Sequence, residues 1–418
     1  MAVMCHQAGL LAGEGTGQID CGQPPRTTLW GEPGVTSLRK NAVVGIGGEV
    51  SVDYTLRKSK SSSIAPDAST IPLDASVSDM ALKHATLRIR ADVHPSVSAF
   101  IKLDFGSHDD RHDEDIVEEA MLVMSAVGGT GLGFFAGRGR APYGQDIALG
   151  MVQSYHHNAN QWDSSEGLIF INDPPLEKKD PADPDQTPRE QPPMRPGQFD
   201  RVFMAGASYT WHDRWKIELA AFQPNMQEYE DRLSRVDGNR NPANIGAAGR
   251  IWWRPFEDLV LQFSAMATRS NDMARIRLRT DIDLGAGARG ADTAYAVSAG
   301  FDWRRGPWRV FGEYQHGWDW NFTKGYDTDT WQVGAARDLT DNLRVGAMVE
   351  GLHIDDGARA VRVKHDYYKL ALNVRYTFDN GVFLLAEYGH EWMRRERGGS
   401  LDERRRGDFI GVRMGMSF

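Results

Sequence analysis

The segment YKLALNVRYTF, residues 368 to 378, shows most clearly the pattern from which the fold class follows. Its apolar side chains stand at alternate positions, from Tyr368 through Leu372 and Val374 to Phe378, and Lys369, Asn373 and Arg375 stand between them. Strict alternation of this kind is the pattern of a β-strand with one apolar and one polar face. The same rhythm recurs from about residue 41 to the C-terminus. Clear examples are 97–105, 259–268, 295–304 and 410–418.

Two kinds of connection alternate between these segments. Short connections rich in turn-forming residues lie at 94–96, 128–131, 212–214, 255–258, 305–307, 340–342 and 379–381. Longer polar connections lie near 57–78, 106–115, 139–199, 225–242, 270–290, 319–326, 355–364 and 393–406. Seven turns and eight loops separate sixteen strands. Strands of about ten residues, even in number, with tight turns at one end and long loops at the other, are typical of outer-membrane barrels.

We therefore predict an all-β fold, a transmembrane antiparallel β-barrel of about 16 strands over residues 41–418. Residues 1–40 are expected to form an N-terminal periplasmic or leader segment that is partly disordered. The chain has 418 residues, a net charge of −9 and a mean hydropathy of −0.48. Its apolar runs are too short for a membrane-spanning helix, which needs about 20 residues, whereas a tilted strand needs only about 9 to 11. The acidic balance argues against nucleic-acid binding.

The third long connection, residues 139–199, is far longer than the others. We expect its first half, 141–171, to fold into the lumen and narrow it, because sixteen strands enclose an aqueous channel. Leu168 and Phe170 would anchor this loop to the wall, and His156, His157 and Asp163 would face the water path. The second half holds eight of the chain's 19 prolines and is expected to lie outside. The alternative is a surface flap.

Charged residues fall at many inward positions of the predicted strands. The predicted pore-lining residues are Arg88, Arg90, Lys102, Asp104, Arg250, Arg304, Arg309, Glu313, Arg344, Lys369 and Arg375. One interpretation is a water-filled pore whose arginines favour anions. The other is a set of ion-paired ladders that brace the wall. At the C-terminus, Phe418 is expected to serve as the assembly signal and to close the barrel against the first strand, about 44–54.

Motifs of catalysis are absent. The sequence has no Gly-x-Ser-x-Gly elbow, phosphate loop or His-Glu-x-x-His. Ser154 with His156 or His157 is only a weak candidate for a hydrolase. The loop 107–115 is rich in carboxylates and imidazoles, and we interpret it as a solvated acidic loop rather than a metal site. We therefore expect no enzyme activity, no cofactor and no bound metal.

One segment resembles a known family. The run Gly137-Arg138-Gly139-Arg140-Ala141-Pro142-Tyr143-Gly144, which follows the acidic strand 115–120, resembles a segment of the siderophore porins (the LbtU-like group). More distantly it is similar to the phosphate-selective porins of the O/P type. The resemblance covers about residues 44–150, and Tyr143 stands where phenylalanine is usual. It implies an outer-membrane barrel that admits anionic or siderophore-type solutes.

These observations together predict a porin of the bacterial outer membrane that allows passive, loop-constricted diffusion of small hydrophilic solutes. Its expected partners are outer-membrane lipid and lipopolysaccharide, the barrel-assembly machinery, other copies in a homotrimer, and the solutes, but no nucleic acid. The alternatives are a scaffold barrel that sheathes a partner such as an electron-transfer cytochrome, and an outer-membrane hydrolase.

Overall fold

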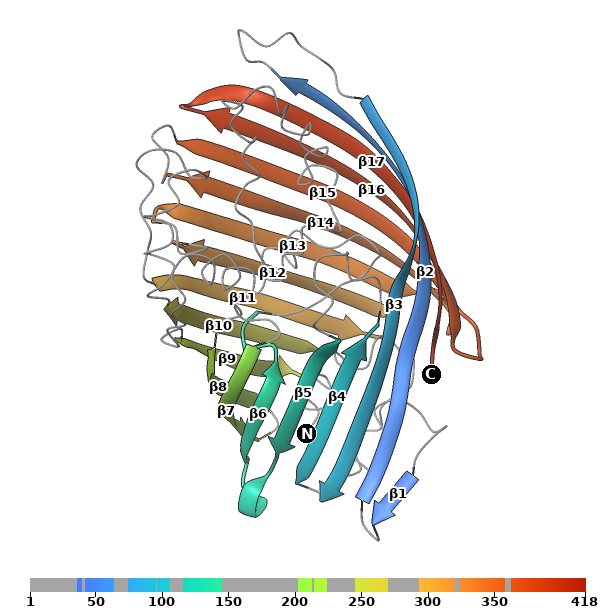
Figure 1. Ribbon diagram of the computed structural model, residues 1–418, viewed down its shortest axis with the longest axis vertical. Helices are drawn as coiled ribbons and strands as arrows, with labels where there is room; N and C mark the ends of the chain where they lie inside the picture. Colours follow the sequence, from blue (N-terminus) through green and yellow to red (C-terminus); the bar gives the residue numbers. More distant parts are fainter. Residues whose placement is uncertain are drawn as a thin grey trace, which may run out of the picture.

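The computed structural model describes seventeen strands and one short 3-10 helix (Figure 1). The described residues are 36–39, 42–63, 74–94, 96–105, 116–144, 202–212, 214–223, 245–269, 293–319, 324–357 and 362–418. The elements are β1 (Thr36–Arg39), β2 (Ala42–Ser63), β3 (Asp74–His94), β4 (Val97–Asp104), β5 (Val117–Met124), η1 (Val127–Gly129), β6 (Leu132–Gly139), β7 (Val202–Trp211), β8 (Trp215–Gln223), β9 (Ile245–Phe256), β10 (Leu259–Arg269), β11 (Thr293–Arg305), β12 (Trp308–Trp318), β13 (Tyr326–Asp338), β14 (Leu343–Asp356), β15 (Val363–Thr377), β16 (Val382–Arg397) and β17 (Ser400–Ser417). Among these residues no helix is long and apolar enough to cross a membrane.

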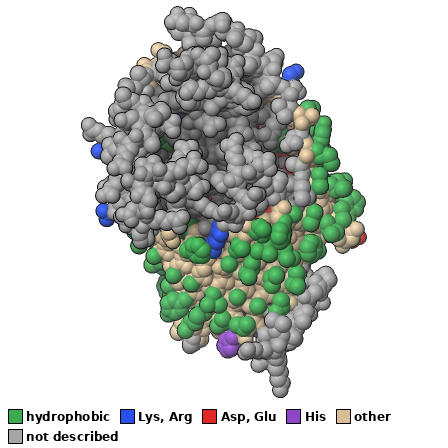
Figure 2. All heavy atoms as spheres, in the orientation of Figure 1, with side chains coloured by type: hydrophobic (Ala, Val, Ile, Leu, Met, Phe, Trp, Pro, Cys, Tyr) green, Lys and Arg blue, Asp and Glu red, His purple; other side chains and the backbone are tan. Residues whose placement is uncertain are grey.

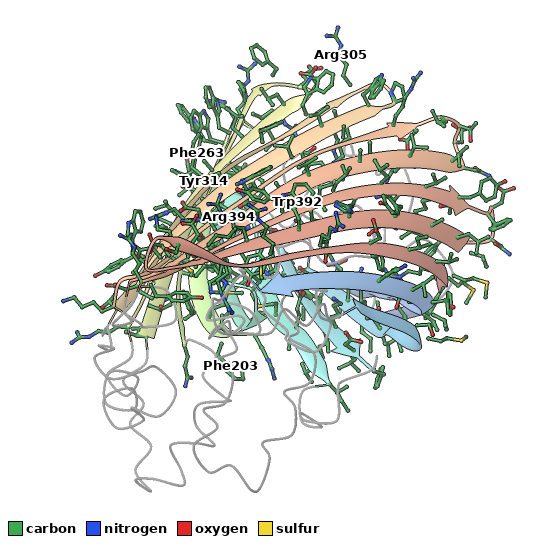
Figure 3. The ribbon with its side chains drawn as sticks, turned by 90° about the horizontal axis from the view of Figure 1, so that it is seen from above. Phe203, Phe263, Arg305, Tyr314, Trp392 and Arg394 are labelled. Carbon is green, nitrogen blue, oxygen red and sulfur yellow. The ribbon has the colours of Figure 1, made fainter. Side chains whose placement is uncertain are left out.

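Strands β2 to β17 form a closed antiparallel ring. Each strand pairs with the next along the chain, and β17 pairs with β2 in a continuous register from Glu403 opposite Ser63 to Ser417 opposite Glu49. The views in Figures 1 and 3 show the strands slanting around this wall. The sixteen-strand antiparallel barrel predicted from the sequence is confirmed. Strand β1, which pairs with the start of β2, was not predicted.

Polar and apolar side chains separate to the two sides of the wall. Along β17, Arg413 is 8% exposed on the inner side, and Ile410 and Met414 on the outer side are 53% and 60% exposed. Figure 2 shows hydrophobic side chains spread over the visible part of the outer surface. An apolar exterior around a polar interior suits a lipid environment, where a closed barrel is the one sheet that leaves no backbone amide unpaired.

The seven short turns occur where the sequence predicts them, and two of the eight long loops need correction. Strands β2 and β3 extend to Ser63 and from Asp74, well inside the predicted loop 57–78. The predicted loop 393–406 is mostly strand, because β16 and β17 are joined at Gly398 and Gly399, both with positive φ. Polar residues suggested a loop there. Strand ends that rise above the hydrocarbon region can carry charge on both faces, so polarity does not mark the end of a strand.

Aromatic side chains gather at the short-turn end of the wall. Trp215 of β8 stacks on Trp253 of β9 with ring centroids 5.1 Å apart, and the Arg337 guanidinium lies 4.8 Å from the centre of the exposed Trp308 ring. Such residues favour the interface between hydrocarbon and headgroups. Short turns of this kind are periplasmic in outer-membrane barrels, and the long loops are extracellular.

Candidate channel and its inner wall

An ion pair joins the first and last strands of the ring. Arg413 of β17 and Asp53 of β2 are partners in the register, and the guanidinium donates two hydrogen bonds, of 2.6 and 2.7 Å, to the two carboxylate oxygens. Both side chains are on the inner side and nearly buried. Bidentate pairs of this geometry are strong and orientation-specific. The pair therefore fixes the register at the one seam that links strands far apart in the sequence.

Two further inward pairs connect strands of the C-terminal half. Glu350 of β14 and Lys369 of β15 stand opposite each other and form an ion pair with both side chains fully buried. The buried Asp302 of β11 accepts hydrogen bonds from Arg309 of β12 at 3.1 Å and from Arg304 at 3.1 Å. Both arrangements fit the brace interpretation of the inner charges.

A larger polar cluster lies on β8 and β9. Glu218 accepts hydrogen bonds from Lys216 at 2.7 Å, from Arg250 at 2.9 Å and from the Trp252 indole at 3.1 Å. The Arg250 guanidinium also lies 4.9 Å from the centre of the Trp252 ring. Glu218 is thus surrounded by donors from two adjacent strands, and the cluster holds the Arg250 side chain in one place.

The chain that follows β6 folds inward onto this cluster. Arg250 donates a hydrogen bond of 3.0 Å to the carbonyl of Gly144, and the Gly144 amide donates one of 2.9 Å to Ser264 of β10. The Tyr143 hydroxyl donates to the carbonyl of Val297 on β11 at 3.2 Å. Ala141 and Tyr143 are 1% and 2% exposed. The third long connection therefore begins on the inner side of the wall.

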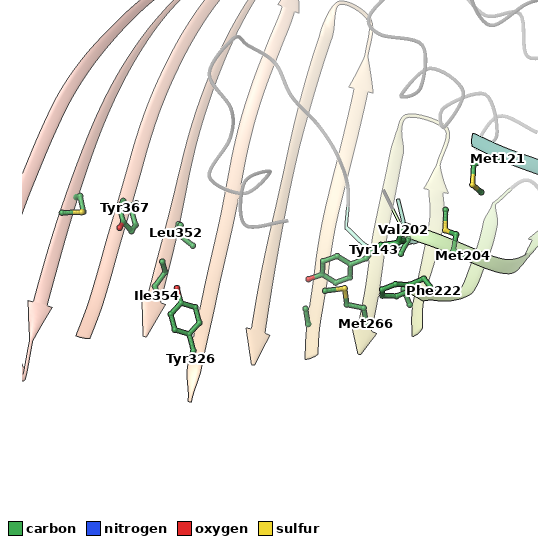
Figure 4. Packing of buried hydrophobic residues seen from close by; sticks show 14 residues of the cluster. Met121, Tyr143, Val202, Met204, Phe222, Met266, Tyr326, Leu352, Ile354 and Tyr367 are labelled. Carbon is green, nitrogen blue, oxygen red and sulfur yellow. The ribbon is translucent and has the colours of Figure 1, made fainter. Parts of the chain in front are cut away.

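Tyr143 packs among apolar side chains of the inner wall. Figure 4 shows its ring beside Met266 and Phe222, which belong to the same buried cluster. Burial, and to a lesser extent the Glu313 carboxylate, raises the pKa of the Tyr143 hydroxyl well above its usual value near 10. The hydroxyl therefore stays neutral and remains a hydrogen-bond donor to the wall.

The predicted pore-lining residues differ in solvent exposure. Lys369 and Glu313 are buried, and Glu313 accepts hydrogen bonds from Ser298 and Gln315. Arg304 is exposed near the short-turn end. The residues with intermediate exposure are Arg88, Arg90, Lys102, Asp104, Arg250, Arg309, Arg344 and Arg375. Their role in lining a pore stays a prediction.

Arg88 and Arg90 stand two residues apart on the inner side of β3. Their register partners on β2 are Gly47 and Gly45, so no side chain stands directly opposite them on that strand. On the other side, Arg88 is opposite Lys102 of β4. Arg90 donates a 2.8 Å hydrogen bond to Asp92 of its own strand. Glu119 of β5 is opposite Lys102. This part of the inner wall therefore holds three cations together with the carboxylates Asp92 and Glu119.

Phe418 lies at the seam beside the short-turn end. Its amide and carbonyl form a reciprocal pair of hydrogen bonds with Gly48 of β2, of 3.1 and 3.0 Å. The end of the chain thus meets the segment 44–54 as the sequence suggests, and the role of Phe418 in assembly stays a prediction.

Several other predicted positions lie outside the described residues. These are the constriction residues His156, His157, Asp163, Leu168 and Phe170, the hydrolase candidate Ser154, and the acidic loop 107–115. In the part of the chain that the structure describes, no three His, Cys, Asp or Glu side chains come together as metal ligands would.

The sequence analysis missed a repeat that places glutamates on the inner face and histidines on the outer face of successive hairpins. Glu313, Glu350 and Glu387 follow one another at intervals of 37 residues, and His316, His353 and His390 do the same. Each histidine contacts an aspartate on the next strand through Nδ1: Asp329 at 2.7 Å, Asp366 at 2.6 Å and Asp408 at 2.9 Å, respectively. The constant interval is a signal that a search for internal repeats would have found.

Comparisons with known proteins agree with this architecture. The family model described as autotransporter β-domain matches residues 308–418, which is well under half of the chain. A search of curated proteins gives no match. The outer membrane channel DcaP of Acinetobacter baumannii is similar over 92% of this chain and 99% of its own, with a TM-score of 0.55 and 14% identity. OmpT, an outer membrane protein of Vibrio cholerae, is similar over 91% and 99%, with a TM-score of 0.52 and 13% identity.

At sequence identities this low, the structural matches show the fold alone. The siderophore-porin resemblance is not tested by these matches and remains an expectation. The closed ring of strands, with its apolar exterior and polar interior, agrees with the structural matches. The chain is therefore an outer-membrane β-barrel of porin-like architecture, located in a bacterial outer membrane.

Proposed function

We propose that this barrel is a passive channel for small hydrophilic solutes, narrowed by its third long connection. The observation that carries the proposal is the inward course of 141–144, which begins a long connection inside the barrel and is held there by three hydrogen bonds. A barrel of sixteen strands is wide enough for an aqueous channel, so a segment held against its inner wall reduces the cross-section available to solutes.

The positions of the anchor and of the inward arginines support a preference for anions. The anchor lies on β9, β10 and β11, and Arg88 and Arg90 lie on β3, half-way around the sixteen-strand ring. A solute that passes the anchored segment is directed toward the side that carries these two arginines and Lys102, with Asp92 and Glu119 beside them. In a confined aqueous pore such fixed charges raise the local concentration of the opposite ion. Anionic solutes, including siderophore-type chelates, are the class that this wall favours.

Single-channel recording on the purified full-length protein tests the proposal. Residues 141–199, which include the anchored segment, are replaced by a short Gly-Ser linker, and as a matched control the same linker replaces residues 226–241, which form another long connection. The first variant should conduct clearly more than the wild type, and the control should conduct as the wild type does. Equal conductance of the two variants, with both barrels folded, would refute a constriction by the third connection.

A further inference from the structure

An apolar patch interrupts the polar inner wall on β4, β5 and β6. Its members are Phe100, Val123 and Phe135, which are partly exposed and pack against the buried inner cluster that contains Met121. Phe100 is directly opposite Met121, and Val123 is directly opposite Phe135, so the patch is continuous over the three strands. The inner side of such a barrel is normally polar. Apolar surface that water reaches there is typical of a binding groove.

A glycine on the next strand holds the Phe135 ring in place. Gly206 of β7 is the register partner of Phe135, and a Cβ at Gly206 would lie 2.4 Å from the Cζ atom of that ring. The ring therefore lies over the Gly206 backbone. An aromatic surface that is already fixed costs little to order when a second ring packs on it.

Arg90 of β3 borders this patch. It is directly opposite Phe100 on β4, and its partner on β2 is Gly45, which places no side chain there. The Arg90 Nε atom donates a hydrogen bond of 2.8 Å to Asp92, and the Arg90 side chain is 20% exposed. A guanidinium carries five N–H groups in a planar fork. Asp92 thus orients the fork through Nε, and the two terminal nitrogens are the donors that a carboxylate matches bidentately.

Charges of both signs surround the patch. Arg88, Lys102 and Glu119 are successive register partners on β3, β4 and β5, and Asp104 lies two residues from Lys102 on the inner side. These carboxylates weaken the general attraction for anions at this place. Discrimination between one anion and another must therefore come from geometry, which here means one oriented guanidinium beside an apolar aromatic surface.

We infer that Arg90, Phe100, Val123 and Phe135 form a selecting site for small aromatic carboxylates. The solute carboxylate accepts hydrogen bonds from the Arg90 terminal nitrogens, and the solute ring packs on Phe100 and Phe135 in offset or edge-to-face contact. Side chains directly opposite each other have Cβ atoms about 5 Å apart, so a ring bonded to its own carboxylate reaches both groups. The inference rests on the proposed channel and names the class of solute that its open side selects.

Single-channel recording on the purified full-length protein in planar bilayers tests the site. Sodium benzoate is added to a potassium chloride solution, and the concentration that gives half of its effect on the chloride current is measured. For the wild type this concentration should be about tenfold lower than for acetate, which lacks the ring, and for benzamide, which lacks the carboxylate.

Variants separate the two halves of the site. Arg90→Gln should raise the half-effect concentration of benzoate about tenfold, and Phe100→Ala should raise it about fivefold. Arg90→Lys keeps the charge and loses the planar fork, so it should weaken the response to benzoate and leave the reversal potential in a chloride gradient unchanged. The matched controls are Arg254→Gln, on the inner side of β9, and Phe134→Ala, on the outer side of β6. Both should respond as the wild type does.

The outcomes distinguish this inference from the proposed channel. A wild type that does not conduct would overturn both. A conducting wild type with equal responses to benzoate, acetate and benzamide would overturn the selecting site alone, as would a wild-type response in Arg90→Gln and Phe100→Ala, or an equal loss in the controls.

The patch has one competing role, which is to pack against another part of the chain. In that case Phe100→Ala would raise the chloride conductance without changing the response to benzoate, and the inference would be refuted. A heat-dependent gel shift shows that each barrel is folded. If Phe100→Ala does not fold, Phe100→Leu is measured in its place, because leucine keeps the apolar contact and removes the ring. It should weaken the response about threefold, and an unchanged response would also refute the inference.

Discussion

The buried pair Glu350–Lys369 offers a direct measure of how dry the inner wall is. The substitution Lys369→Met keeps most of the side-chain volume and leaves the buried Glu350 carboxylate without the Lys369 ammonium group. Both side chains are 0% exposed, and breaking a buried pair by removing one partner typically costs 3–5 kcal/mol. The double variant Glu350→Leu, Lys369→Met removes both charges and should recover most of that loss, because an apolar pair of similar volume avoids the cost of burying charge.

Denaturant unfolding of the refolded barrel in detergent, followed by tryptophan fluorescence and by the gel shift, measures these free energies. The control is Arg344→Gln. Arg344 pairs with Asp338 at 2.7 Å, with side chains 30% and 48% exposed. An exposed pair contributes about 0.2–1 kcal/mol, so this variant should unfold almost as the wild type does. If Lys369→Met also costs less than about 1 kcal/mol, water reaches the pair, and the inner wall between β14 and β15 is hydrated rather than braced.

Three further predictions concern other parts of the barrel. Changing both Arg88 and Arg90 to Glu should shift the reversal potential in a salt gradient toward cations, and an unchanged potential would mean that their charges are neutralised within the wall. Deleting Phe418 removes the reciprocal hydrogen bonds to Gly48 and should lower the amount of barrel inserted in the outer membrane without lowering synthesis, whereas Phe256→Ala at the same end should not. A Cβ at Gly351 of β14 would lie 2.5 Å from the indole nitrogen of Trp331 on β13, so Gly351→Ala should displace this indole, change its fluorescence and cost about 1–3 kcal/mol; an unaltered spectrum would contradict the close contact.

The barrel itself could be predicted because its signal is local. Alternation along 368–378 and turn residues such as those at 379–381 each act over a few positions. Where the prediction was wrong, at 393–406, the physical context had changed: beyond the hydrocarbon region both faces of a strand tolerate charge, and alternation is lost although the strand continues. The turn at Gly398 and Gly399 was the only local sign of the hairpin.

The partners of the inner charges could not be predicted in the same way. Asp53 and Arg413 are 360 residues apart, and they meet because the ring closes in one register. The anchor of Tyr143 and Gly144 likewise depends on β10 and β11, which follow more than a hundred residues later. Such contacts depend on strand number and stagger, which alternation alone does not determine. The 37-residue interval of the histidines was visible in the sequence, but its meaning depends on neighbouring hairpins being placed at one level.

The inner and outer arginines stand on opposite sides of one wall, and this makes the assignment of face testable. Arg88 and Arg90 are on the inner side, where a confined aqueous path carries their field to a passing solute. Arg394 and Arg406 are exposed on the outer side, and the wall lies between them and the lumen. Changing the inner pair to Glu should therefore alter ion preference, and changing the outer pair to Glu should leave the reversal potential as it is. An outer variant that altered ion preference would mean that the assignment of face is wrong.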